Sequence, residues 1–93
     1  MEPRWAGESL YVRELLSGLL VLRHDWSEPK LLGGSAGLAF SVLGSEPMPM
    51  DQIATMVIAR FGLTVDDYTN FLATLAEALQ MLVAEGVATL HER

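Results

Sequence analysis

The chain has 93 residues, of which 51% are hydrophobic and 19% are charged, and this composition is that of one small domain with its own core rather than of a disordered segment. Twelve acidic residues against six basic ones give a net charge of −6, which argues against a nucleic-acid partner, because neutralising phosphates is the main source of that affinity. The sequence contains no cysteine, which excludes disulfides, thiolate metal sites and cysteine nucleophiles and fits a reducing, cytoplasmic setting.

The first third of the chain predicts a small sheet. Residues 1–9 carry no apolar core of the signal-peptide kind, and we expect a loose N-terminal segment there. Residues 10–32 read as extended: "LYVREL", a turn at Ser17-Gly18, "LLVLRHDW", and "KLL" after a Ser-Glu-Pro break. Aliphatic and aromatic runs between Gly, Ser and Pro are typical of strands, so we predict a three-stranded antiparallel meander. The apolar runs are too short to cross a bilayer, and we expect no membrane partner.

The rest of the chain predicts three helices. The first covers residues 36–43, with Ser35 as its N-cap and Gly44 as its stop, and the second covers 50–61 and ends at Gly62. The third covers 65–85 and is the clearest, because its apolar residues fall in one stripe at 100° per residue: Tyr68, Leu72, Leu75, Leu79 and Leu82. Gly86 follows it, and "VATL" predicts a last extended piece. The fold class is therefore α+β.

The turn "GGSAG" at Gly33–Gly37 raises the question of a phosphate site. A phosphate-binding loop needs glycines spaced so that several N–H groups converge, together with a Lys or an acidic ribose partner. This turn has neither the spacing nor a Lys after it, since Lys30 precedes it. We interpret the glycines as a hinge that lets a strand deliver Ser35 to the start of a helix.

No catalytic constellation is apparent. His24 and His91 are the only histidines, and His24 beside Asp25 has no nucleophile placed with it. We interpret both histidines as surface residues, and we predict no catalytic residue, no metal site and no cofactor. Trp5 and Trp26 lie outside the helices, and we expect them as lids on the core face of the sheet, with a peptide anchor as the alternative for Trp26.

Three stretches resemble the PqqD family, the peptide chaperones or leader-peptide recognition elements of ribosomal peptide modification. They are "KLLGGSAGLAFSVL" (a strand, a short turn and an alanine-containing helix), "PMPMDQIATMVIARFG" (a second helix after a Pro-bearing linker) and "LAEALQMLVAEGVATL" (a leucine-rich helix ending in Glu-Gly-Val). The likeness covers about residues 19–90. It is strongest to the subgroup found beside kinase-like proteins related to the HPr kinase.

The resemblance implies a winged-helix-like fold in which the three-stranded sheet precedes the three helices. It also implies a non-catalytic domain, spanning residues 1–93, that captures a precursor peptide and presents it to a modifying enzyme. An extended leader peptide would add as a further strand to the edge at Lys30, Leu31 and Leu32. The groove floor would be one flank of the third helix, either Phe71, Leu75, Ala78 and Leu82 or Leu72, Ala76, Leu79 and Val83.

Two other functions compete with peptide capture. Residues 50–85 could form a helix-turn-helix, but a DNA-recognition helix should bring Arg or Lys to the duplex, and residues 65–85 contain neither. The second alternative is a docking domain that forms a homodimer, because the same edge strand can pair with a second copy of itself.

Overall fold

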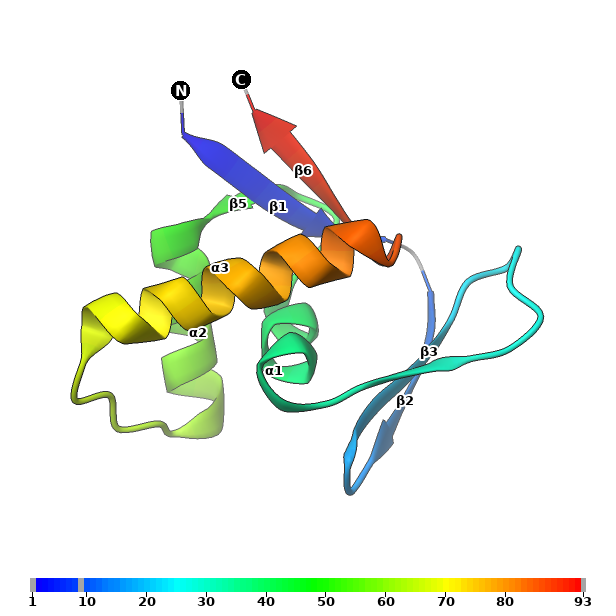
Figure 1. Cartoon of the computed structure of the whole chain (residues 1–93), viewed down its shortest axis with the longest axis horizontal. Coiled ribbons are helices and arrows are strands. Elements are labelled where there is room, and N and C mark those ends of the chain that lie inside the picture. The colour runs from blue at the N-terminus through cyan, green and yellow to red at the C-terminus, as the bar shows by residue number, and fades with distance from the viewer. Residues whose placement is uncertain (1, 9, 93) are drawn as a thin grey trace.

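The computed structural model describes residues 2–8 and 10–92, which form two small antiparallel sheets and three helices (Figure 1). In chain order the elements are β1 (Pro3–Gly7), β2 (Tyr11–Leu15), β3 (Gly18–Leu22), β4 (Lys30–Leu32), α1 (Gly34–Val42), β5 (Met48–Pro49), α2 (Met50–Phe61), α3 (Tyr68–Ala84) and β6 (Ala88–Glu92). The predicted α+β class is confirmed, with a second sheet beside the predicted one.

The predicted meander is the sheet β2-β3-β4, which we call the meander sheet. β2 and β3 form a hairpin in which Leu15 pairs with Gly18, so the turn residues are Leu16 and Ser17 rather than Ser17 and Gly18. β4 then pairs antiparallel with β3. The hairpin extends beyond the helices, while β4 leads directly into α1 (Figure 1).

The second sheet, with the order β5-β1-β6, joins the two ends of the chain and is called the terminal sheet here. The prediction of a loose segment over residues 1–9 is wrong for the described part of it. β1 pairs with β6 from Pro3↔Glu92 to Gly7↔Ala88, and Trp5 and Ala6 are buried. The extended piece predicted at "VATL" is confirmed as part of β6.

The helix boundaries follow from local chemistry. The N-cap of α1 lies two residues earlier than predicted, because Gly33 is the cap and Ser35 already lies inside the helix. Gly34 has the positive φ of 55° that a glycine adopts without strain. α2 ends at Gly62 in the left-handed conformation, as predicted. α3 begins at Tyr68 rather than at residue 65, because the Asp67 side chain accepts a hydrogen bond from the Asn70 N–H.

One core joins both sheets to the helices. The buried face of α3 contributes Leu75, Ala78, Leu79 and Leu82, which confirms most of the predicted stripe, whereas Tyr68 is exposed. Trp5 is a lid on this core, and Trp26 is half-buried against it. Over the residues that the structure describes, no helix has the length and apolar character needed to cross a membrane.

Candidate functional site

β4 is an edge strand. In the order β2-β3-β4 it has β3 on one side, paired through Leu19↔Leu32, Leu20↔Leu31 and Val21↔Lys30. Backbone N–H and C=O groups on the outer side of an edge strand are available to another extended chain. Lys30 and Leu31 are exposed, with Leu31 at 52%, while Leu32 faces the core.

The end of α3 lies beside this edge. The Lys30 ammonium forms an ion pair with the Glu85 carboxylate, which belongs to the C-cap residue of α3. Glu85 follows Ala78 by seven residues and Leu82 by three, the spacing of side chains on one face of a helix. Of the two flanks of α3 that the sequence left open, the one with Ala78 and Leu82 is therefore nearer to β4.

The loop between β3 and β4 is also tied to the end of α3. Arg23 donates from Nη1 to the carbonyl oxygen of Gly86 at 2.9 Å and from Nε to Asp25 at 2.9 Å. The Lys30 ammonium lies 5.2 Å from the ring centroid of Trp26, within the range of a cation–π contact. These contacts bring Arg23, Trp26 and Lys30 together near the C-terminal end of α3.

Most of the predicted groove residues are core residues. Leu32, Leu75, Ala78 and Leu82 are all less than 9% exposed, so their side chains belong to the core and offer little surface to a ligand. Phe71 is half-buried, and Lys30 and Leu31 are exposed. The accessible part of the predicted site is thus the β4 edge together with Phe71.

Phe71 borders a hollow of about 320 Å³ between α1 and the start of α3. Ser35 and Leu38 of α1 form one wall, and the loop before α3 contributes apolar and acidic residues. The full lining is Ser35, Leu38, Leu63, Thr64, Val65, Asp66, Asp67, Asn70, Phe71, Thr74 and Leu75. One of its lining residues, Ser35, comes three residues after the end of β4.

The other edge of the meander sheet, β2, is a surface that the sequence reasoning missed. All five of its residues are exposed. A hollow of 500 Å³ separates the Val12 and Glu14 side of β2 from Phe40 and Leu43. The signal was present in "YVREL", which has the strand pattern, contains no Lys or Pro, and carries two charges that cancel.

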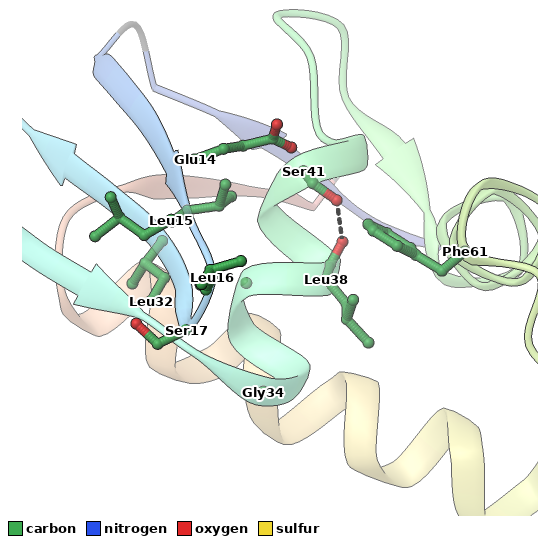
Figure 2. A pocket seen from close by; sticks show the side chains of 12 residues that line it. Glu14, Leu15, Leu16, Ser17, Leu32, Gly34, Leu38, Ser41 and Phe61 are labelled. Carbon is green, nitrogen blue, oxygen red and sulfur yellow. Dashed lines mark hydrogen bonds between the residues drawn. The ribbon is translucent and has the colours of Figure 1, made fainter.

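A further hollow of 330 Å³ lies at the tip of the hairpin, and its lining includes Leu15, Leu16, Leu38 and Phe61 (Figure 2). It brings together the β2–β3 turn, α1 and the end of α2. The Ser41 hydroxyl beside it donates to the Leu38 carbonyl at 2.7 Å and so lies satisfied on the wall of the hollow. This site can accept an apolar side chain, but it presents no reactive pair.

Both histidines are surface residues, as predicted. His24 and His91 are exposed, and His91 Nε2 lies 3.0 Å from Thr89 Oγ1. Within residues 2–8 and 10–92, no group of three His, Asp or Glu side chains is placed to hold a metal ion.

No protein-family model, curated protein or solved structure matches the chain. The β4 edge and the neighbouring end of α3 are therefore the candidate binding surface.

Proposed function

We propose that this protein is a non-catalytic, cytoplasmic peptide-binding module that captures a precursor peptide by β-strand addition at β4 and presents it to a modifying enzyme. The observation that carries the proposal is the unpaired edge of β4 beside the end of α3. Backbone hydrogen bonds along such an edge supply affinity, and alternate side chains of the added strand supply specificity.

The path of the peptide follows from the surroundings of β4. One row of its side chains would lie beside exposed Leu31, on the face of the sheet away from the helices. The other row would meet the Lys30–Glu85 ion pair, which a bound chain must cross or displace. Beyond Ser35 the chain would reach the hollow at Phe71, which has room for one apolar side chain.

The charges near this path favour a particular kind of peptide. Asp66 and Asp67 border the hollow at Phe71, and the protein as a whole carries a net charge of −6. Complementary charges increase the association rate and select the register of a bound chain. We therefore expect an extended peptide in which an apolar residue is followed or preceded by Lys or Arg.

The experiment is an amide-shift titration of the isotope-labelled domain with short peptides encoded near its own gene. A binding peptide is then made in two N-methylated forms, each blocked at alternate residues. In an added strand only every second N–H faces the edge, so one form loses binding and the other retains it. Equal affinity of the two forms would show that backbone pairing is not the mode of recognition.

A pair of matched variants locates the edge. Leu31→Glu changes the side chain beside the added strand and is expected to weaken binding about two- to fivefold, the effect of losing one cross-strand pair. Tyr11→Glu makes the same change on the opposite edge of the sheet and leaves the affinity unchanged. The reverse pattern would move the peptide from β4 to β2.

Retarded migration of duplex DNA at low salt would favour the helix-turn-helix alternative instead.

A further inference from the structure

β2 is the second unpaired edge of the meander sheet, and it is more exposed than β4. Its side chains include Tyr11 at 77% exposure, Val12 at 49% and Leu15 at 43%, and its one neighbour in the sheet is β3. The hairpin extends beyond the helices, so the outer side of β2 is open to another molecule (Figure 1).

The two edges of the sheet differ in how they are protected. Natural edge strands are usually short or carry charged residues, above all Lys, or Pro or a bulge, and these features discourage unspecific association through the edge. β4 follows this rule, because it has three residues, follows Pro29 and begins with Lys30. β2 has five residues and contains no Pro or Lys, and its two charged residues, Arg13 and Glu14, are of opposite sign. β2 is therefore the less protected of the two edges and the better suited to pair with a second copy.

The sequence of β2 is complementary to itself in one register. Two copies related by a two-fold axis perpendicular to the sheet pair antiparallel and keep each side chain on its own face. An axis at Arg13 places Arg13 against Arg13, and an axis at Glu14 places Glu14 against Glu14. An axis at Val12 places Val12 against Val12 and sets Tyr11 opposite Arg13 of the second copy, twice.

We propose that two copies of this protein associate through β2, antiparallel and with the two-fold axis at Val12. The resulting sheet has the order β4-β3-β2-β2-β3-β4. Its centre holds two cation–π pairs between Tyr11 and Arg13 on one face and the two Val12 side chains on the other. β2 is neutral, since Arg13 and Glu14 compensate each other, so the net charge of −6 lies outside the contact.

A second copy fits this edge better than an unrelated peptide because one segment, Leu10 to Glu14, supplies both sides of the contact: Val12 faces Val12, Tyr11 faces Arg13 and Leu10 faces Glu14. The association does not depend on peptide capture, because it uses β2 and leaves both β4 edges at the two ends of the joined sheet. Failure of one proposal therefore leaves the other standing.

Single cysteines test the register, because the chain has none of its own. In the proposed register the two residues at position 12 have Cα atoms about 4.5–5.5 Å apart, within reach of a disulfide. The two residues at position 13 are about 8 Å apart, beyond the limit of about 7 Å. Val12→Cys is expected to give a covalent dimer on mild oxidation, whereas Arg13→Cys and Glu14→Cys remain monomers on the same time scale.

Light scattering of the full chain supplies the second readout. The wild type is expected at twice the mass of the 10.2 kDa chain, and Val12→Lys, which opposes two ammonium groups at the axis, is expected at the monomer mass. Leu31→Lys on β4 is the control and stays dimeric. A monomeric wild type at high concentration, or equally fast crosslinking at positions 12, 13 and 14, would overturn the proposal.

Discussion

Gly37 lies on the buried face of α1, against the end of β4. A Cβ at this position would lie 2.7 Å from the carbonyl oxygen of Leu32, a backbone atom that cannot rotate away. We expect Gly37→Ala to lower the free energy of unfolding by about 1–3 kcal/mol, the usual effect of overpacking. Gly44→Ala is the control, because a Cβ there meets nothing within 4 Å. Urea denaturation measures both, and a Gly37→Ala protein as stable as the wild type would contradict the close approach.

Asp67 and Asp66 are neighbouring carboxylates with different roles at the start of α3. Asp67 accepts from the Asn70 N–H at 3.0 Å and caps the helix. Asp67→Ala is expected to reduce the free energy of unfolding by about 0.5–2 kcal/mol, and Asp66→Ala by less than about 0.5 kcal/mol. Thermal denaturation followed by circular dichroism compares them, and equal losses would mean that the charge and not the cap stabilises the helix.

The two helix starts show what residue type alone predicts. "VDDY" contains a capping residue, and the structure uses it at Asp67. "GGSA" also contains one, Ser35, but the chain enters the helix two residues earlier at Gly33. The reason is that Gly34 adopts a positive φ and turns the backbone before Ser35 is reached. A serine near a helix start identifies the helix but not which residue caps it.

At the scale of the elements, the loop between β3 and β4 is held against the end of α3 by two cations. Arg23 donates to the Gly86 carbonyl in a partly buried site, whereas the Lys30–Glu85 ion pair is solvent-exposed. Arg23→Ala is expected to cost about 1.5 kcal/mol, because a charged hydrogen bond is lost and its acceptor is left unpaired. Lys30→Ala is expected to cost between about 0 and 1 kcal/mol. Denaturant midpoints measure both, and a larger loss for Lys30→Ala would reverse this ranking.

The meander sheet could be predicted from the sequence, and the terminal sheet could not. β2, β3 and β4 lie close together in the chain, so their turns and apolar runs are visible in one stretch of sequence. The terminal sheet joins residues near the two ends with a two-residue strand at Met48–Pro49. "PRWAG" contains Pro and Gly, which lower the strand signal, and its pairing with β6 depends on distant residues.

The candidate site also has a part that local sequence predicts and a part that depends on long-range packing. The β4 edge could be located from the meander, because the last strand of a meander is an edge strand. The accessibility of the α3 flank could not be predicted, because apolar spacing is the same for a groove floor and a core. Leu75, Ala78 and Leu82 are core residues, and only packing against α1 and the sheets reveals it.

The stability of the molecule depends on β1, which lies in the segment that the sequence predicted to be loose. Trp5 is 8% exposed and joins β1 to the core, whereas Trp26 is half-buried. We expect Trp5→Ala to cost about 3–5 kcal/mol, a large part of the roughly 5–15 kcal/mol that stabilises a small domain. Trp26→Ala is expected to cost less. Calorimetry compares the two melting temperatures, and a Trp26→Ala protein that melts lower than Trp5→Ala would show that the meander loop contributes more to stability than the terminal sheet does.

The pairing of β1 with β6 also determines how the molecule responds to a pulling force. Pro3 lies opposite Glu92, so force applied at the two ends of these strands acts across the ladder rather than along it (Figure 1). The hydrogen bonds of an antiparallel pair then break one after another from that end, instead of resisting together in shear. As the two strands peel apart, Trp5 leaves the core with them. Tension between the ends would therefore open this protein from its terminal sheet inwards, with the helices and the meander following.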